Sequence, residues 1–255
     1  MKSEFENRTY LVSGAASGLG LDICVKLISN GAKVFALDFD AFGLSKLFDE
    51  LGQSKMLSTV ECDITIESSV KSAIAEIALK TDSLEGLVNS AGIVKAKKFL
   101  EFDQKDLEQT FAVNVYGTFY VMKYSVPLLQ KGSNPRIVNF ASMAGKISGP
   151  YTAPYAASKA AVISLTRSAA VALAPKINVN SICPGIIETP MWNELGSDLE
   201  KLGFPNHAEN RASQSPLGRA GKTAEVSEVA LFLLSDAAKY ITGEDLNVSG
   251  GLVMH

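Results

Sequence analysis

The sequence predicts an α/β protein built on one doubly wound parallel sheet of about seven strands, with helices on both faces. The main observation is an alternation along the 255 residues, in which short runs rich in β-branched residues are separated by segments of helical periodicity. This alternation is typical of βαβ units. The second observation is that no linker rich in proline, glycine or serine interrupts it. We therefore expect a single domain over residues 1–255.

The predicted elements follow one another in order along the chain. Thr9–Val12 forms the first strand, and an amphipathic helix then runs from Gly18 to a stop at Gly31. Further strands are expected at 33–37, 57–62, 87–89, 137–140, 178–182 and 246–248. Further helices are expected at about Ser68–Lys80, Asp103–Leu129, Tyr155–Ala174 and Ala224–Leu234.

Residues 189–219 do not fit the alternation. The stretch is long for a connection and mixes polar residues with spaced apolar ones, namely Met191, Trp192, Leu195, Leu202 and Phe204. Long connections within compact domains are usually functional lids or disordered segments. The spaced apolar residues favour a lid.

Composition and charge exclude several classes of partner. The net charge of −3 provides no electrostatic attraction for nucleic acid or an anionic membrane. The N-terminus lacks the apolar core of a signal peptide, and we expect no span of the roughly 18 apolar residues that a bilayer requires. Cys24, Cys62 and Cys183 are far apart and indicate buried thiols. Two histidines, His207 and His255, are too few for a metal cluster. We therefore expect a cytoplasmic protein without a metal.

A glycine-rich turn, Ser13–Gly20, lies between the first strand and the first helix. Gly14, Gly18 and Gly20 have the spacing G-x-x-x-G-x-G rather than the common G-x-G-x-x-G. In Rossmann-like folds, glycines at this position let the backbone approach a dinucleotide pyrophosphate at a helix N-terminus. The motif alone is weak, and a purely structural turn is the alternative.

Two aspartates follow the second and third strands. Asp38 lies 18 residues after Gly20, where a carboxylate can accept hydrogen bonds from the ribose hydroxyls of a dinucleotide. The alternative is that Asp38 caps the next helix, although Asp40 could do so equally well. Asp63 either holds the adenine or caps the helix that follows it.

Tyr155 and Lys159 have the spacing i, i+4 and therefore share one face of a helix. The pKa of a free tyrosine is about 10, and a nearby cation lowers it by favouring the phenolate. Proton transfer to or from an alcohol then becomes practicable near neutral pH. The Tyr-x-x-x-Lys pattern also occurs by chance, so it needs support from other residues.

That support comes from polar residues at the ends of predicted strands. Ser142 follows strand 137–140, and Asn89 and Gly92 close strand 87–89. Ligands of open α/β sheets bind at this carboxyl edge. Asn114 lies in the middle of a predicted helix, where a structural and a catalytic role are both open.

Together these residues resemble the short-chain dehydrogenase/reductase family over essentially the whole chain. Each signature is weak alone, and their joint occurrence at these spacings carries the resemblance. Ser13 replaces the usual threonine, and Ser90 stands in place of a second asparagine. The signatures are, in order, Gly14-x-x-x-Gly18-x-Gly20, Asp63, Asn89-Ser90-Ala91-Gly92, Asn114, Ser142 with Tyr155-x-x-x-Lys159, and Pro184-Gly185.

The resemblance implies a role for each catalytic residue. Tyr155 is the acid/base, and Ser142 orients and polarises the substrate oxygen. Lys159 lowers the pKa of Tyr155 and holds the nicotinamide ribose, while Asn114 positions a water in the proton path. The expected cofactor-binding residues are Ser13, Gly14, Ser17, Gly18, Leu19, Gly20, Asp38, Asp63, Asn89, Ala91, Gly92, Tyr155, Lys159, Pro184, Gly185, Ile187 and Thr189.

The expected cofactor is NAD rather than NADP. Asp38 would place a carboxylate beside the ribose 2′ position, where it repels the extra phosphate of NADP. Ser17 and Phe39 stand where NADP-preferring relatives carry a basic residue, and both are uncharged. If Asp38 instead turned away to cap a helix, the site would accept both cofactors.

The expected activity is NAD(H)-dependent interconversion of a secondary alcohol and a ketone. A 3-ketoacyl-carrier-protein reductase is the alternative, although Val171 stands where those relatives carry an arginine that docks the acidic carrier. A non-catalytic dinucleotide-binding sensor would be expected to lack Ser142, Tyr155 or Lys159. The substrate itself is not predicted, but the positions expected to face it are Lys95, Met143, Tyr151, Met191, Trp192 and Phe204.

A homo-oligomer, expected to be a tetramer as in most relatives, is indicated by surplus apolar residues on two predicted helices. One sheet-facing stripe does not account for all of them, and a thickly packed single core is the alternative. The residues are Phe111, Val115, Phe119 and Met122 on 103–129, and Val162, Leu165, Ala169 and Leu173 on 155–174.

Overall fold

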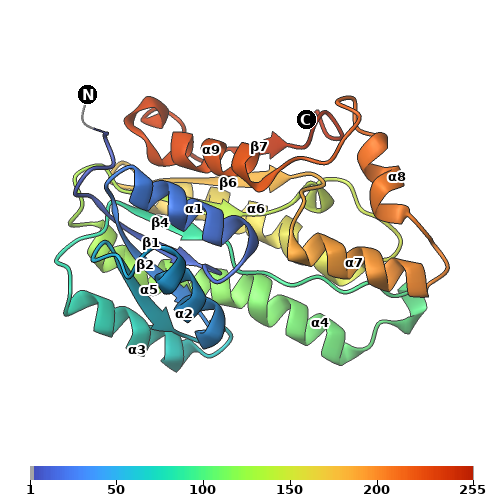
Figure 1. Ribbon diagram of the computed structural model, residues 1–255, viewed down its shortest axis with the longest axis horizontal. Helices are drawn as coiled ribbons and strands as arrows, with labels where there is room; N and C mark the ends of the chain where they lie inside the picture. The colour runs from blue at the N-terminus through green and yellow to red at the C-terminus, as the bar shows by residue number, and fades with distance from the viewer. Residues whose placement is uncertain (1–2, 255) are drawn as a thin grey trace.

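A seven-stranded, all-parallel sheet forms the centre of the computed structural model, which describes residues 3–254 apart from the side chains of 207 and 208 (Figure 1). The strand order is β3-β2-β1-β4-β5-β6-β7. This confirms the predicted fold class. The strands are β1 (Thr9–Ser13), β2 (Lys33–Asp38), β3 (Leu57–Glu61), β4 (Gly86–Asn89), β5 (Arg136–Phe140), β6 (Asn178–Pro184) and β7 (Asp245–Val248).

Helices cover both faces of the sheet, as expected for a doubly wound fold. One core cluster packs α1 (Gly18–Ser29), α2 (Ala41–Glu50) and α9 (Thr223–Leu234) against one face. The second packs α3 (Glu67–Ala78), α5 (Thr118–Leu129) and α6 (Ala153–Leu173) against the other. Alternate residues of β1 point to opposite faces, so Tyr10 and Val12 join the first cluster and Leu11 joins the second.

The sheet has a switch point at β1, which lies between β2 and β4. From β1 the chain winds outward through β2 and β3, then returns to β4 and winds the other way. Loops at the carboxyl ends of β1 and β4 therefore diverge and leave a crevice between them. Ser13 at the end of β1 pairs in register with Asn89 at the end of β4, which places two predicted site segments side by side.

Two helical predictions were incomplete. Helix α2 was not predicted, and Asp40 caps it by accepting a hydrogen bond from the Gly43 N–H at 3.0 Å. The predicted helix 103–129 is interrupted by a π-helical turn, η2 (Ala112–Gly117), between α4 (Gln104–Phe111) and α5. Gly117 lets the π-helical turn pack closely on the Ile64 side chain, because a Cβ on residue 117 would lie only 2.5 Å from it.

Most of the apolar helix residues that suggested an oligomer interface pack within this chain instead. Met122 and Val162 are buried, and Leu165 packs against the second core cluster together with Ala169 and Leu173. Among the residues cited for an interface, Phe119 remains exposed. Leu107 and Tyr116, from the same stretch, are also exposed.

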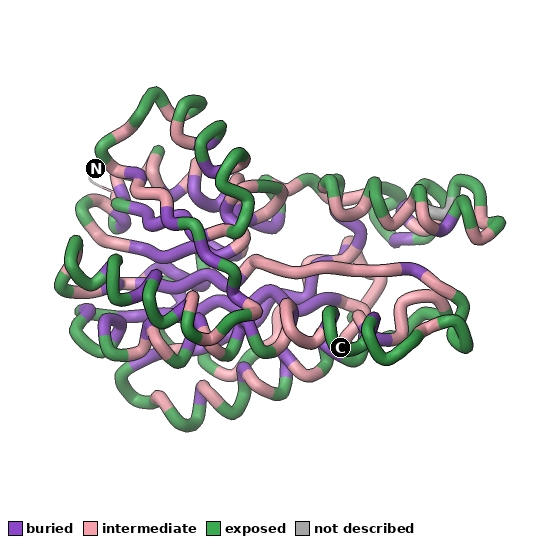
Figure 2. Tube along the Cα trace, turned by 90° about the horizontal axis from the view of Figure 1, so that it is seen from below, coloured by how far each residue is buried: buried purple, intermediate pink, exposed green. Residues whose placement is uncertain are grey.

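The segment 189–219 consists largely of two helices, α7 (Pro190–Lys201) and α8 (His207–Ser213). Figure 1 shows both beyond the carboxyl edge of the sheet. Buried residues concentrate in the sheet, whereas the segments that project from it are mostly intermediate or exposed (Figure 2). Most of the described side chains of the predicted lid segment therefore lie outside the core.

One helix within residues 3–254, α6, is long and apolar enough to cross a membrane by length and composition, which the sequence analysis did not expect. It packs against β6 and carries the buried polar side chains of Ser158, Lys159 and Thr166. These features are those of a core helix of a sheet protein.

Cys24, Cys62 and Cys183 are free and buried, as predicted. In the described part of the chain no group of side chains could hold a metal ion, whereas His255 and the side chain of His207 lie outside it.

Candidate active site

Two adjoining cavities open at the carboxyl edge of the sheet. The first, of about 380 Å³, is lined by Ser142, Tyr155 and Lys159; the second, of about 520 Å³, is lined by the glycine-rich turn and Asp38. The residues that line both cavities are Leu19, Ser90, Gly92, Thr189 and Met191. A ligand could therefore extend from one cavity into the other.

The glycine-rich turn is tightly packed against the start of the β4 loop. Gly14 has φ +70°, and a Cβ on it would lie 2.5 Å from the Ala91 nitrogen. A Cβ on Gly20 would lie 2.0 Å from the Gly14 carbonyl oxygen. Real side chains cannot occupy either position without moving the backbone, so both glycines are needed for this close packing, and Gly14 lines the second cavity.

The N-terminus of α1 faces this cavity with free backbone donors. Ser17 is the N-cap residue, but its side chain makes no capping hydrogen bond. The first N–H groups of a helix carry partial positive charge and favour an anion such as phosphate. Gly18 and Ser17 both line the cavity, so the donors and the empty space are adjacent.

Asp38 ends β2 with its carboxylate fixed beside the glycine-rich turn. Its Oδ2 accepts a hydrogen bond from the Ala16 N–H at 3.0 Å, and its Oδ1 accepts one from the Asp40 N–H at 3.1 Å. Because Asp40 caps α2, the alternative that Asp38 caps this helix is wrong. The Asp38 side chain lines the second cavity, and none of the described residues lining this cavity is a lysine or an arginine.

Asp63 also lines the second cavity, at the end of β3. Its Oδ1 accepts hydrogen bonds from the Thr65 N–H at 2.9 Å and the Thr65 hydroxyl at 2.7 Å. The N-cap residue of α3 is Ile66, so Asp63 fixes a local turn rather than capping the helix directly.

Ser13 and Asn89 lie beneath the cavities rather than on their walls. The Ser13 hydroxyl donates to Asn89 Oδ1 at 3.3 Å, and the Asn89 amide donates to Asn139 Oδ1 at 2.9 Å. Asn139 in turn donates to the Thr166 hydroxyl of α6 at 3.0 Å. This buried polar network joins β1, β4, β5 and α6 directly below the site.

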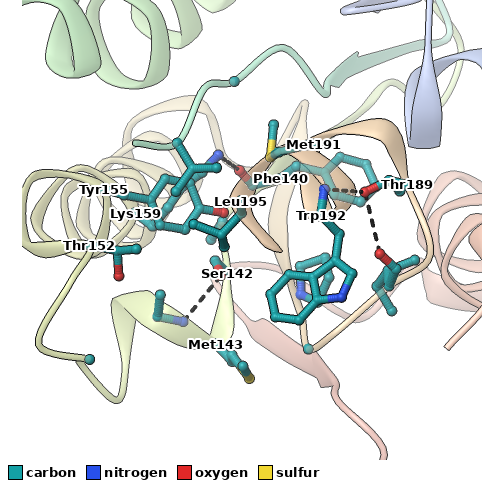
Figure 3. Close-up of a pocket in the computed structure, with 18 of the residues that line it drawn as sticks. Phe140, Ser142, Met143, Thr152, Tyr155, Lys159, Thr189, Met191, Trp192 and Leu195 are labelled. Carbon is teal, nitrogen blue, oxygen red and sulfur yellow. Dashed lines mark hydrogen bonds between the residues drawn. The ribbon is translucent and has the colours of Figure 1, made fainter. Parts of the chain in front are cut away.

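Ser142, Tyr155 and Lys159 come together on the wall of the first cavity (Figure 3). Lys159 is buried, and its ammonium donates to the Phe140 carbonyl oxygen at 2.7 Å. The same ammonium lies 5.7 Å from the centre of the Tyr155 ring. The Ser142 hydroxyl accepts from the Ala144 N–H at 3.1 Å. The structure thus brings the three predicted catalytic side chains to one wall.

Burial dominates the protonation of these groups. It raises the pKa of Tyr155, and a hydrogen bond with the Ser142 side chain opposes the rise. It lowers the pKa of Lys159 to about 8, because the ammonium loses its hydration. In this structure, therefore, Lys159 does not bring the pKa of Tyr155 below its ordinary value, as the spacing had suggested. At neutral pH Tyr155 is a neutral phenol, the form that can donate a proton.

Asn114 is buried in the π-helical turn, and its side chain is fully engaged with protein groups. Its amide donates to the Ile93 carbonyl oxygen at 3.0 Å and to the Ser158 hydroxyl at 2.9 Å, and its Oδ1 accepts from the Ile93 N–H at 2.8 Å. Ser158 donates to the Tyr155 carbonyl oxygen at 2.7 Å. Asn114 therefore fixes the β4 loop to the helix that carries Tyr155.

Gly92 completes this arrangement by having no side chain. A Cβ on Gly92 would lie 3.3 Å from both Asn114 Oδ1 and Lys159 Nζ. Any side chain there would press on both groups.

The loop after β6 joins the two cavities. A Cβ on Gly185 would lie 2.7 Å from the Ser249 Cα, and Pro184, Gly185 and Ile187 line the first cavity. Thr189 caps α7, since its hydroxyl accepts from the Trp192 N–H at 3.3 Å and donates to the Ile187 carbonyl oxygen at the same distance (Figure 3). These contacts place Thr189 opposite Gly18, whose Cβ would lie 3.8 Å from the threonine methyl group.

The wall of the first cavity is mostly apolar. Met143, Tyr151, Met191 and Trp192 line it, as predicted. Phe204 does not line it but packs on Tyr151, with 4.5 Å between ring centres. This contact holds the α7–α8 turn against the loop before α6.

Lys95 does not face the cavity, and that prediction was wrong. Its ammonium lies 2.7 Å from Gln109 Oε1 and 3.4 Å from Asp106 Oδ1. Lys95 and Lys97 both form ion pairs with the buried carboxylate of Asp106 on α4. The hydrogen bond from Lys97 lowers the pKa of Asp106 to about 2.

Sequence reasoning missed several residues of the site. Ser158 lies inside the Tyr-x-x-x-Lys motif, so its position was available from the sequence. Leu199 and Arg211 line the first cavity from the predicted lid segment, and no local pattern distinguishes them, whereas Leu195, which also lines it, was one of the spaced apolar residues that favoured a lid.

The second cavity fits a dinucleotide by its shape and its donors. The glycine-rich turn lets backbone approach a pyrophosphate, α1 supplies free N–H groups, and Asp38 offers carboxylate oxygens for hydroxyl groups. Lys159 and Tyr155 line the first cavity, which adjoins the second through the lining residues that the two share.

Known proteins resemble this chain over its whole length. The family model described as enoyl-(acyl carrier protein) reductase matches residues 14–253. A 3-oxoacyl-(acyl-carrier-protein) reductase of Thermotoga maritima is 36% identical over 98% of this chain and 99% of the relative. Cyclopentanol dehydrogenase of a Comamonas species is 34% identical over 96% of both chains. A solved glucose/ribitol-type short-chain dehydrogenase from Brucella melitensis has a TM-score of 0.90 at 36% identity and covers 100% of both.

The lowered pKa of Lys159 predicts a pH-dependent stability effect. A lysine whose pKa falls from 10.5 to about 8 on folding destabilises the fold at neutral pH. Stability therefore rises between those two values, where the unfolded chain binds more protons than the folded one. Because the bond to Phe140 is also lost, Lys159→Met should raise the free energy of unfolding by about 1–2 kcal/mol at pH 7. Urea unfolding near pH 7 and near pH 10 measures the difference, which should fall by about 2.5 kcal/mol at the higher pH, so that Lys159→Met is the less stable protein there.

Lys105→Met at an exposed position of α4 is the matched control. It should change the free energy of unfolding by less than about 0.5 kcal/mol at both pH values. A Lys159→Met protein that is less stable than wild type near pH 7 would contradict the prediction.

Proposed function

Because this chain belongs to the short-chain dehydrogenase/reductase family of oxidoreductases, we propose that it is an NAD(H)-dependent enzyme that interconverts a secondary alcohol and a ketone. The family acts on the CH–OH group of donors and uses nicotinamide cofactors. The observation that carries the finer proposal is the convergence of Ser142, Tyr155 and Lys159 on a cavity continuous with the Asp38 cavity. The bound cofactor supplies or accepts the hydride.

The protein residues manage the proton of the substrate oxygen. In reduction, the Tyr155 hydroxyl donates its proton to the oxygen as the carbonyl becomes an alcohol. Ser142 donates a hydrogen bond to the same oxygen and orients the carbonyl. The raised pKa of Tyr155 keeps the donor protonated at neutral pH, and in oxidation the phenolate is the base.

Lys159 and Asn114 act behind Tyr155. The ammonium of Lys159, which lies 5.7 Å from the centre of the Tyr155 ring, would stabilise negative charge that forms on the phenol oxygen and would bind a ribose hydroxyl of the cofactor. Asn114 is a positioning residue whose amide fixes the β4 loop to α6. A water that continues the proton path would bind beside this connection.

NAD is favoured over NADP by the charge of the second cavity. The Asp38 carboxylate offers acceptors for two ribose hydroxyls and repels a 2′-phosphate. Among the described residues lining this cavity no cation is available to neutralise that phosphate, and Phe39 is the residue after Asp38. The orientation of Asp38 toward Ala16 supports this choice.

A 3-oxoacyl-(acyl-carrier-protein) reductase is the second candidate, because relatives with that name reach 36% identity. The surface of α6 argues against it. Val171 is 83% exposed and uncharged, and Arg167, one turn earlier, forms an ion pair of 2.5 Å with Asp245. An acidic carrier therefore finds no free cation at this position of α6.

We also propose a homotetramer located in the cytoplasm. The support for an interface comes from Leu107, Tyr116 and Phe119, which leave an apolar strip exposed along α4, η2 and α5. The support for the compartment comes from the three free thiols.

Replacement of Tyr155 tests the acid/base role. Tyr155→Phe keeps the ring but removes the proton donor, so turnover should fall by about 10²–10⁴-fold. Binding of NADH, measured by its fluorescence, should stay within about twofold, since the cofactor cavity is unchanged. Alcohol oxidation by wild type should rise with pH as the phenolate forms. Residual turnover above about a tenth of wild type would remove Tyr155 from this role.

Replacement of Asp38 tests the cofactor choice. Wild type should favour NAD+ over NADP+ by more than about tenfold in kcat/KM with one alcohol, because two anions would otherwise meet unneutralised. Asp38→Ala should lose most of that ratio, becoming poorer with NAD+ and better with NADP+. Asp40→Ala, which removes the cap of α2, is the matched control and should retain the ratio. Equal use of both cofactors by wild type would contradict the proposal.

The mass in solution tests the tetramer. The chain has a mass of 27.1 kDa, so light scattering at micromolar concentration should give about four times that value. Phe119→Asp, which places a charge in the exposed strip, should lower the mass. A wild-type mass near 27.1 kDa would exclude an oligomer.

A further inference from the structure

We infer that the substrate carries an anionic group, a carboxylate or a phosphate, that is bound by Arg211 of the lid. The inference rests on the proposed function, since it concerns the cavity in which the alcohol or ketone would react. It adds a substrate class to that function. The basis is the distribution of charge around the first cavity.

The first cavity has cations on its wall and no carboxylate. Lys159 and Arg211 are the only charged side chains among its described lining residues. Lys159 donates to the Phe140 carbonyl oxygen, and the proposed function assigns its other donors to Tyr155 and the cofactor ribose. Arg211 is therefore the charged group available to a ligand, in a protein whose net charge is −3.

Arg211 is also unlike the other arginines of the chain. Its Nη1 donates to Gln214 Oε1 at 3.0 Å, and this partner is a neutral amide. No acidic side chain of the described residues lies within ion-pair distance of it. By contrast, every other arginine has a carboxylate partner, namely Arg8 and Arg136 with Asp236, Arg167 with Asp245, and Arg219 with Glu225.

Arg211 is partly buried as a residue and lines a cavity whose wall is mostly apolar. A guanidinium has five N–H donors in a planar fork that matches two oxygens of a carboxylate or phosphate. Only one of these donors is used by Gln214. A charge-assisted bond in such a partly desolvated place is stronger than one in water.

The rest of the wall indicates what joins the two ends of the substrate. Met191, Trp192, Leu195 and Leu199 of α7 line the cavity between the loop after β6 and α8. Tyr155 belongs to α6 and Arg211 to α8, so the reacting carbon and the anion contact different elements. The substrate class is therefore a hydroxy acid or keto acid, or the corresponding phosphate ester, with an apolar middle.

Matched substrate pairs test the inference. The probes are secondary-hydroxy fatty acids of graded chain length, the corresponding hydroxyalkyl phosphates, and the methyl esters of the acids, each with NAD+. Wild type should use an anionic member with a kcat/KM at least about tenfold above that of its ester, a difference typical of one charge-assisted bond. The two anionic series distinguish a carboxylate site from a phosphate site, and preference for either supports the inference.

Variants separate the role of Arg211 from a general effect of charge. Arg211→Gln should remove the preference for the anion while kcat/KM for the ester stays within about twofold. Arg211→Lys should retain part of it. Lys201→Gln removes an exposed cation from the same lid segment, outside the cavity, and should leave the preference unchanged.

Three results would overturn the inference: a wild type that does not prefer the anion, an equal loss for acid and ester in Arg211→Gln, or an equal loss of preference in Lys201→Gln. A failure of the proposed function looks different, because then no probe, charged or neutral, reduces NAD+. In that case the inference is tested by calorimetry, which measures the affinity of the NADH-saturated protein for the corresponding keto acid and keto ester. Tighter binding of the acid that Arg211→Gln abolishes supports the inference, and equal binding overturns it.

Discussion

The hydrogen bond from the buried Lys159 ammonium to the Phe140 carbonyl oxygen is the interaction around which the site is built. It fixes α6 against the end of β5, because the donor and acceptor belong to these two elements. Tyr155 lies one helical turn before Lys159, and Ser142 lies two residues beyond Phe140. One bond therefore sets the relative position of all three side chains. Its cost is the desolvation of a cation, which lowers the pKa of Lys159 to about 8.

Other residues of the site have a backbone conformation or a buried polar side chain that is unfavourable by itself, and contacts with neighbouring residues of the sheet and its loops stabilise them. Gly14 has a positive φ, Asn114 lies in a π-helical turn, and Asn139 is a polar residue inside a buried strand. For example, the buried side chain of Asn139 accepts a hydrogen bond from the Asn89 amide and donates one to the Thr166 hydroxyl. Parallel strands place their carboxyl ends at one edge of the sheet, so these stabilising contacts lie at the edge where ligands of such sheets bind.

Sequence reasoning found all seven strands and the residues at their carboxyl ends, because short runs rich in β-branched residues and glycine turns are local signals. It missed α2, although Asp40 before Leu44 and Leu47 was a usable capping signal. It could not find the π-helical turn, since helical periodicity continues through 103–129. It also assigned the wrong direction to the pKa of Tyr155: the i, i+4 spacing reveals the nearby cation but not the burial, and burial dominates. Arg211 was missed because only the tertiary fold brings it to the cavity.

Chemistry and recognition are carried by parts of the fold that differ in burial. Ser142 and Lys159 are buried and belong to the loop after β5 and to α6, whereas Leu199 and Ala212 are the buried residues among the described side chains of α7 and α8. A segment with few buried contacts can move and change sequence at small cost to the core. Arg211 belongs to that segment, and the packing of Phe204 on Tyr151 holds it over the cavity. Substrate choice can therefore change through α7 and α8 without disturbing the bond between Lys159 and Phe140 that positions the proton donor.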